Sequence, residues 1–283
     1  MLLLPLLWSA LIGADTLLVS PAWLSAHLGQ PGLVVIHADR TRAPYDSGHI
    51  AGSRYLPLSA IVVERNGVPV ELPDAAVLDS VLESVGIGDS SRIVIPGEPL
   101  AAARLFFTLD YMGLGSRVAL LEGGTPAWVE AGFPVSGDPA TESRGSLTPH
   151  LRPEVLADAA WVQSHLRDST VALLDARPPA DYAGTPGSTP PTGHIPGARN
   201  LFWKTTMGGT PLVLLPRATL EEMFRAANAA PGKLVVTYCR TGVQASFLYF
   251  VARYLGYDVR MYDGSFAEWS QLAGVSIENG AGK

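Results

Sequence analysis

The feature that most constrains the fold of this chain is an internal duplication. A short apolar run at 33–37 is followed by a Gly-His-Ile-Ala-Gly segment at 48–52, and a similar run at 171–174 is followed by Gly-His-Ile-Pro-Gly at 193–197. Later in each copy, an acid–glycine pair precedes a tryptophan, with Gly123 before Trp128 and Gly264 before Trp269. The period is roughly 140 residues, which is too long for a solenoid and predicts two homologous domains.

Within each copy, apolar β-branched runs alternate with segments of helical pattern. We expect strands at 33–37, 91–95, 171–174 and 233–237, and helices at 104–113 and 246–256. Ser20 followed by Pro21 is typical of a helix N-cap and first helical position. This alternation predicts an α/β fold in which each domain is a mostly parallel sheet flanked by helices.

The domain boundaries follow from the repeat and from composition. We expect an apolar leader at 1–14, one domain at 15–136, a linker at 137–152 that is rich in Gly, Pro and Ser, and a second domain at 153–283. The leader is too short to span a membrane. It suits the apolar part of a secretory signal but lacks a positively charged start. The chain is therefore expected to be exported to the periplasm if 1–14 acts as a signal, and cytoplasmic otherwise.

Composition excludes several classes of function. The 283 residues are 47% hydrophobic and 16% charged, which predicts a globular protein with a sizeable core. A net charge of -6 gives no support for nucleic-acid binding. A single cysteine excludes an intrachain disulfide, and the six histidines lack ligand spacing, so we predict no metal.

The copies differ most in one loop. The second copy has Cys-Arg-Thr-Gly-Val-Gln-Ala at 239–245, where the first has Pro-Gly-Glu-Pro-Leu-Ala-Ala at 96–102. A strand that leads into a tight loop and a helix N-terminus is an anion site, which should lower the pKa of the Cys239 thiol below about 8.5. The first copy lacks the thiol, Glu98 would repel an anion, and its prolines remove N–H donors. We therefore expect the first domain to be catalytically silent.

Features that both copies share are interpreted as scaffold, because both copies must fold. They include the two Gly-His-Ile turns, the two acid–glycine segments and the Asp-Arg pairs, in which Arg40 is matched with Arg177. On this interpretation Arg177 has a structural role.

The pattern resembles that of tandem-domain rhodaneses, the thiosulfate sulfurtransferases, and of the related 3-mercaptopyruvate sulfurtransferases. The resemblance rests on the duplication, the cysteine loop in the second copy alone and Asp-Gly-Ser-Phe-Ala-Glu-Trp at 263–269, and it covers residues 15–273. It implies two rhodanese-like domains with the active site between them. It also implies a Cys239 persulfide that carries sulfur from a small donor to cyanide or a thiol, with no cofactor. The substrate-binding groups would lie in the loop: Arg240, Thr241, Gly242, Val243, Gln244 and Ala245.

The donor is less well defined by the sequence. Arg240 favours thiosulfate, because a cation after the cysteine goes with that donor in the family. Thr241 is more like the mercaptopyruvate loop, and Asp181 stands where the family usually has a donor-binding arginine. Lys204 is a candidate to supply the missing charge. A 3-mercaptopyruvate sulfurtransferase or a non-catalytic sulfur-carrier module is the alternative, and a monomer is expected. A phosphatase is disfavoured, because Ala245 stands where its loop needs an arginine.

Overall fold

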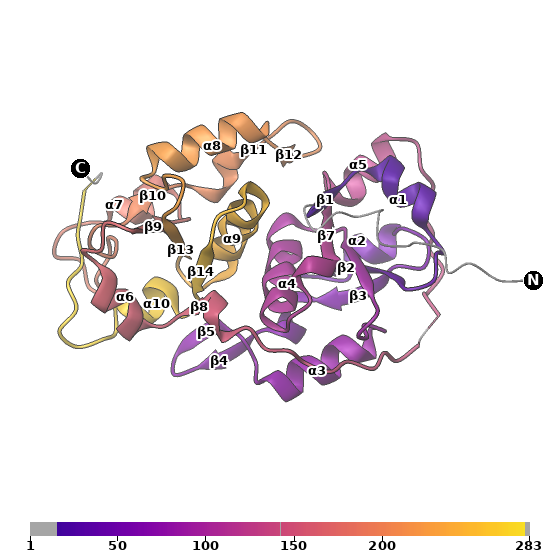
Figure 1. Cartoon of the computed structure of the whole chain (residues 1–283), viewed down its shortest axis with the longest axis horizontal. Helices are drawn as coiled ribbons and strands as arrows, with labels where there is room; N and C mark the ends of the chain where they lie inside the picture. The colour runs from indigo at the N-terminus through magenta and orange to yellow at the C-terminus, as the bar shows by residue number, and fades with distance from the viewer. Residues whose placement is uncertain (1–15, 142, 281–283) are drawn as a thin grey trace, which may run out of the picture.

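The structure is a computed structural model that describes residues 16–141 and 143–280. The predicted leader at 1–14 lies outside the described residues. Two lobes lie side by side, one from each copy of the repeat (Figure 1).

The N-terminal half is built on a five-stranded parallel sheet. Its strand order is β1-β7-β6-β2-β3 (Figure 1). The strands are β1 (Leu18–Val19), β2 (Leu33–Asp39), β3 (Arg54–Pro57), β6 (Arg92–Ile95) and β7 (Val118–Leu121). The helices are α1 (Pro21–His27), α2 (Ala43–Ser47), α3 (Ala75–Ser84), α4 (Pro99–Tyr111) and α5 (Gly124–Glu130).

The C-terminal half repeats this plan. Its parallel sheet has the order β8-β14-β13-β9-β10, which matches that of the first sheet strand for strand. The strands are β8 (Leu156–Ala157), β9 (Val171–Asp175), β10 (Arg199–Asn200), β13 (Leu234–Tyr238) and β14 (Val259–Tyr262). The helices are α6 (Ala159–His165), α7 (Pro179–Ala183), α8 (Arg217–Ala226), α9 (Val243–Leu255) and α10 (Ser265–Trp269). The predicted α/β fold with two parallel sheets is confirmed.

The central layer of the molecule consists of α4 and α9, which pack against each other between the two sheets (Figure 1). Phe106 of α4 meets Phe250 of α9 edge to face, with 5.0 Å between ring centroids, and Phe107 meets Tyr249 in the same way. One buried apolar cluster therefore runs through both halves. Smaller clusters lie under the outer helices of each sheet. The inner faces of the two sheets share a core, so the halves do not meet only through surface contacts.

A short antiparallel hairpin from each half reaches the other half. The hairpin of β4 (Val63–Arg65) and β5 (Val68–Glu71) leads to Leu72, whose N–H donates to Asp263 across the interface at 2.8 Å. The hairpin of β11 (Met207–Gly208) and β12 (Val213–Leu214) packs beside Gly123 of the N-terminal half. Each hairpin thus covers the loop edge of the opposite sheet.

Both central helices begin earlier than predicted. α4 begins at Pro99 and not at 104, because Pro99 takes the first helical position and the Glu98 carboxylate accepts hydrogen bonds from Leu100 N and Ala101 N. α9 begins at Val243, directly after Gly242 in a left-handed conformation. At the first helix of the chain, the predicted Ser20 cap is confirmed by its 3.1 Å hydrogen bond from Trp23 N.

The strand ladders correct the way in which the two copies were matched. Ala38 N donates to Pro96 O as Ala176 N donates to Tyr238 O. In the same register, Ile36 pairs with Arg54 as Leu174 pairs with Arg199. The structural counterparts are therefore Gly97 for Cys239, Asp39 for Arg177 and His37 for Asp175.

The expected matches of Pro96 with Cys239 and of Arg40 with Arg177 are wrong. Each match is one position out of register, because Gly97 and not Pro96 is level with Cys239, and Asp39 and not Arg40 is level with Arg177. These positions lie at or just beyond the strand ends, where the apolar pattern that identifies the strands does not define the register.

Candidate active site

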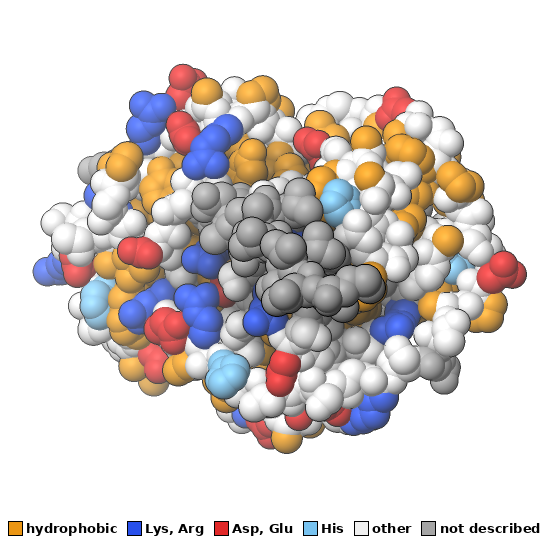
Figure 2. Space-filling view, turned by 45° about the vertical axis from the view of Figure 1, so that its right-hand side comes forward, with side chains coloured by type: hydrophobic (Ala, Val, Ile, Leu, Met, Phe, Trp, Pro, Cys, Tyr) orange, Lys and Arg blue, Asp and Glu red, His pale blue; other side chains and the backbone are white. Residues whose placement is uncertain are grey.

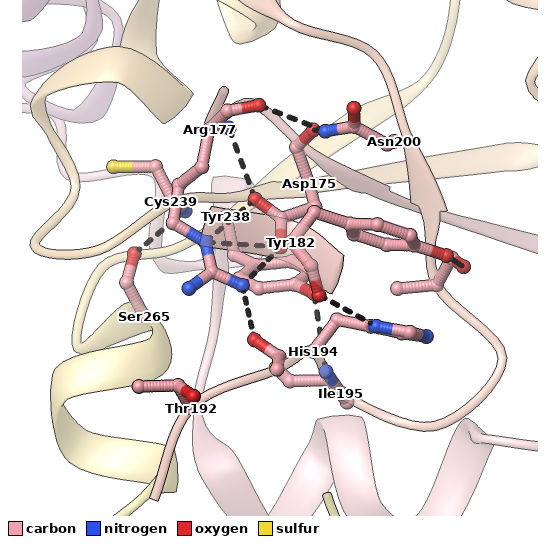
Figure 3. A network of polar contacts seen from close by, with 12 residues as sticks. Asp175, Arg177, Tyr182, Thr192, His194, Ile195, Asn200, Tyr238, Cys239 and Ser265 are labelled. Carbon is pink, nitrogen blue, oxygen red and sulfur yellow. Dashed lines mark hydrogen bonds and ion pairs between the residues drawn. The ribbon is translucent and has the colours of Figure 1, made fainter. Parts of the chain in front are cut away.

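Cys239 follows β13 directly and begins the loop that leads into α9. Its N–H donates to Ser265 Oγ at 3.2 Å, and its carbonyl accepts from Phe266 N at 3.0 Å. Its Sγ accepts a hydrogen bond from Gly242 N at 3.1 Å. In Figure 3 the sulfur points away from the Asp175–Arg177 network and toward the turn of the loop. Backbone groups of the loop therefore surround the thiol.

Two opposing effects set the pKa of the Cys239 thiol. The side chain is 1% exposed, and this burial raises its pKa above the ordinary value. The backbone N–H groups of Ala245, Thr241, Gly242 and Gln244 act in the lowering direction. Burial is the larger effect, so the expectation of a lowered pKa is wrong for the free protein. The loop does supply the N–H groups that were expected, but it also removes the sulfur from water.

Gly242 is the tightest point of the loop. Its φ is +95°, and a Cβ there would lie 2.7 Å from Asp263 Oδ1 and 3.0 Å from Arg104 Nη1. A side chain at this position would therefore meet both strain and collision. The Gly242 N–H that contacts the sulfur is thus held against a buried ion pair.

That ion pair joins the two halves of the molecule. Arg104 of α4 is fully buried and makes two hydrogen bonds to Asp263, of 2.5 Å from Nη1 and 3.1 Å from Nη2. Asp263 also accepts from Leu72 N, so two segments of the N-terminal half converge on one carboxylate. The N-terminal half therefore contributes a guanidinium directly behind the cysteine loop.

The place of Arg104 beside the cysteine loop was not predicted, although the sequence contains a signal for a buried and paired charge. Arg104 is the one charged residue in the run Pro-Leu-Ala-Ala-Ala-Arg-Leu-Phe-Phe-Thr-Leu at 99–109. A charge in an otherwise apolar helix is expensive to bury unless it is paired. The partner lies 159 residues away in the chain, so the sequence alone did not identify it.

Arg240, the residue after the cysteine, is exposed. Its guanidinium makes no hydrogen bond or ion pair with any residue that the structure describes, and its carbonyl accepts from Ala267 N at 2.9 Å. The backbone of Arg240 is therefore held by a hydrogen bond, while its side chain is exposed and could contact a ligand. Lys204, in the turn at Trp203–Thr206, and Asp181 of α7 are also exposed.

The remaining loop residues form the start of α9. Thr241 and Gln244 are partly exposed, whereas Val243 and Ala245 are buried. Val243 and Ala245 thus anchor the helix end in the core. The structure brings all seven predicted loop residues together at one helix N-terminus, and their roles in binding stay a prediction.

The comparisons with known proteins agree with this geometry. Residues 158–272 match the family model of the rhodanese-like domain. The chain is 31% identical over 266 residues to a thiosulfate sulfurtransferase of Pseudomonas aeruginosa, and the match covers 93% of this chain and 97% of the relative. The chain belongs to the rhodanese family. It is a tandem rhodanese-family sulfurtransferase, as its residues and duplication predicted.

Other relatives of this rhodanese carry different names. The sulfur carrier protein TtuD of Thermus thermophilus is 30% identical over 284 residues, with 93% of this chain and 96% of that protein covered. A solved structure of the anaerobic ergothioneine biosynthesis enzyme from Chlorobium limicola superposes with a TM-score of 0.82 at 25% identity. That match covers 93% of this chain and 70% of the other. This chain is therefore similar to proteins that are named for different roles.

The N-terminal half has a shorter loop at this place and lacks the thiol. Two residues fewer separate Pro96 from α4 than separate its counterpart Tyr238 from α9. The Glu98 carboxylate occupies the first N–H groups of α4. The helix N-terminus in this half therefore holds an anion that belongs to the chain itself.

The Asp175–Arg177 pair is buried in the C-terminal half. Arg177 is 2% exposed, and its guanidinium contacts both oxygens of Asp175 and the Gly193 carbonyl, the latter at 2.6 Å (Figure 3). The structural role predicted for Arg177 agrees with this geometry, but its basis was incorrect, because Asp39 and not Arg40 is the counterpart. The pair belongs to one copy only.

The other shared motifs make equivalent contacts in both halves. His49 stacks on Tyr45 and His194 on Tyr182, and each Nδ1 lies 2.9 Å from the carbonyl oxygen of that tyrosine. Trp128 and Trp269 each donate to a carbonyl in the segment that follows their helices. These contacts support the interpretation that the motifs are scaffold.

Surface and ligand-binding features add two observations. Within the described ranges, no helix has the length and apolarity to cross a membrane, and no three His, Cys, Asp or Glu side chains gather as metal ligands. On the part of the surface that Figure 2 displays and the structure describes, lysine and arginine side chains are interspersed with acidic ones. This face offers no broad positive surface of the kind that nucleic acids need.

Proposed function

We propose that this protein is a thiosulfate sulfurtransferase that works through a persulfide on Cys239. The observation that carries the proposal is the loop itself. The only thiol of the chain accepts a hydrogen bond from Gly242 N at the N-terminus of α9, beside an exposed Arg240 whose guanidinium has no partner among the described residues. Thiosulfate is a dianion, and an exposed guanidinium next to a ring of N–H donors suits its sulfonate oxygens.

The first step transfers sulfur to the protein. The Cys239 thiolate attacks the outer, sulfane sulfur of thiosulfate, a new S–S bond forms, and the S–S bond of thiosulfate breaks. Sulfite leaves with the electron pair, and Cys239 becomes a persulfide anion. This is nucleophilic catalysis that divides one transfer into two displacements.

The backbone supports each anion in turn. The N–H groups of Thr241, Gly242, Gln244 and Ala245 act on the sulfur, and the positive end of α9 adds to their field. In the second step, cyanide or a thiolate attacks the outer sulfur of the persulfide, and the Cys239 thiolate leaves. Thiocyanate or a new persulfide is the product. Neither step needs a metal or an organic cofactor.

3-Mercaptopyruvate is the second candidate donor, because Thr241, the partly exposed residue after Arg240, is not a cation. That donor carries a carboxylate and needs a cation of its own. Arg177 cannot serve, since it is buried against Asp175, and Asp181 has the wrong charge. Thiosulfate is therefore the better match to the charges present.

The test is a thiocyanate assay with thiosulfate or 3-mercaptopyruvate as donor and cyanide as acceptor. We expect turnover with thiosulfate, weaker turnover with 3-mercaptopyruvate, and none with Cys239→Ser, since a hydroxyl cannot form the persulfide. A faster reaction with 3-mercaptopyruvate would show that it, and not thiosulfate, is the preferred donor. Retained activity in Cys239→Ser would refute the mechanism.

A further inference from the structure

The N-terminal half has a cleft where the C-terminal half has its cysteine loop. The cleft has a volume of about 660 Å³ and is lined by β2, α2, the loop before α4, and α5. Gly97, the counterpart of Cys239, lies in its wall. The silent copy has thus kept a hollow at the carboxyl edge of its sheet, the place where α/β folds bind ligands.

The charges of this cleft are the reverse of those around Cys239. Asp39 stands at the place of Arg177, and Glu98 follows Gly97 as Arg240 follows Cys239. Glu130 of α5 adds a third carboxylate. None of the residues that line the cleft is a lysine or an arginine, although Arg40 beside it pairs with Glu98 at 3.7 Å. A site with this charge repels the anions expected at the other copy.

His37 is a second observation that points to a ligand. It lines the cleft and is 2% exposed, yet its Nε2 has no hydrogen-bond partner among the residues that the structure describes. Its Nδ1 lies 3.5 Å from Thr125 Oγ1. Burial lowers the pKa of His37, so the ring is neutral at pH 7. A buried polar atom without a partner is costly, and a ligand would supply the missing bond.

One carboxylate oxygen of Asp39 is also available to a ligand. Its Oδ1 accepts from Arg40 N at 2.7 Å. Its Oδ2 accepts no hydrogen bond from the described residues, and lies 3.8 Å from His37 Nε2, beyond hydrogen-bond distance. A buried ring nitrogen without a partner and a carboxylate oxygen that accepts no hydrogen bond from the described residues thus lie side by side. A ligand N–H group is the complement of such a pair.

We infer that this cleft binds a small organic cation, an ammonium with an apolar body. The ammonium donates to Asp39 Oδ2 and to His37 Nε2, with Glu98 and Glu130 adding negative charge. Pro44, Val129 and Val135 supply the apolar wall. Nothing in this inference depends on sulfur transfer at Cys239.

The test is calorimetric titration of the full-length protein with benzylamine, which is an ammonium at pH 7. Benzoate serves as the matched anion. We expect one saturable site for benzylamine and none for benzoate. The lack of a saturable signal up to about 10 mM would overturn the inference, since a Kd of roughly 1 mM is visible there.

Variants locate the site. Asp39→Asn should weaken benzylamine binding about tenfold or more, as expected for a lost charge-assisted bond. Glu130→Gln, on an exposed side chain, should weaken it by a smaller factor without any risk to folding. Asp181→Asn removes an exposed carboxylate from the other half and should change nothing. Equal affinity in all three variants would overturn the inference.

Discussion

Arg104 and Asp263 form a buried ion pair that ties the N-terminal half of the molecule to the cysteine loop. The guanidinium comes from α4 and the carboxylate from the turn after β14, and the backbone of Gly242 lies against both. The N-terminal domain of this rhodanese therefore does more than form one wall of an interface. It fixes the element that presents N–H groups to the thiol.

We predict that Arg104→Met lowers both stability and activity. It leaves Asp263 buried without its cation, which should cost about 3–5 kcal/mol of unfolding free energy. Denaturant unfolding and the thiocyanate assay measure the two effects. Adding Asp263→Asn should restore part of the stability, because the two changes are coupled.

Arg167→Met is the matched control for Arg104→Met, because Arg167 is exposed and should change the unfolding free energy by less than about 0.5 kcal/mol. If Arg104→Met behaved like this control, the pair would have no part in holding the loop.

Alanine variants of Gly242 and Gly256 should separate the effect of backbone strain from the effect of the close contact with Arg104 and Asp263. Gly242 and Gly256 begin and end α9 with positive φ angles, of +95° and +87°, but a Cβ at Gly256 would meet nothing within 4 Å. Both alanine variants should lose about 1–2 kcal/mol of stability from left-handed strain. Only Gly242→Ala should also lose sulfur transfer. Equal activity in the two variants would contradict the geometry proposed for the loop.

Arg240→Ala should raise the thiosulfate KM by roughly tenfold or more, with a smaller effect on kcat, because it removes a charged hydrogen-bond donor from the substrate. Steady-state kinetics at varied thiosulfate measure this. Arg167→Ala removes another exposed cation of the same half and should leave KM unchanged. An unchanged KM in Arg240→Ala would exclude Arg240 from donor binding.

The reactivity of Cys239 should rise with pH. Burial raises the pKa of the thiol, so the protonated form dominates at neutral pH and the thiolate fraction grows as pH increases. Alkylation by iodoacetamide should therefore be slow at pH 7 and still be accelerating above about 8.5, the ordinary value for a free cysteine. The unfolded protein should titrate at that ordinary value. A rate that is already constant below pH 8 would show that the N–H groups outweigh burial.

The sequence predicted much of the fold because the repeat is strong. Strands that end at Ile95 and Tyr238, and the Ser20 cap, depend on local patterns of apolar and capping residues. The loop residues after Cys239 could be assigned to one site because they are consecutive in the sequence.

What the sequence did not predict depends on contacts between distant segments. The equivalence of Gly97 with Cys239 needed the strand register, which residue types alone misplaced. Arg104 and Asp263 needed the packing of α4 on α9. The raised pKa of the Cys239 thiol is caused by its burial in the core, which no local sequence pattern predicts.

The most direct test of the central claim is the intact mass of the protein after incubation with thiosulfate and removal of excess donor. The account predicts a gain of one sulfur atom in the wild type, its loss on addition of cyanide, and no gain in Cys239→Ser. An unchanged mass in the wild type, or the same gain in Cys239→Ser, would contradict a persulfide on Cys239.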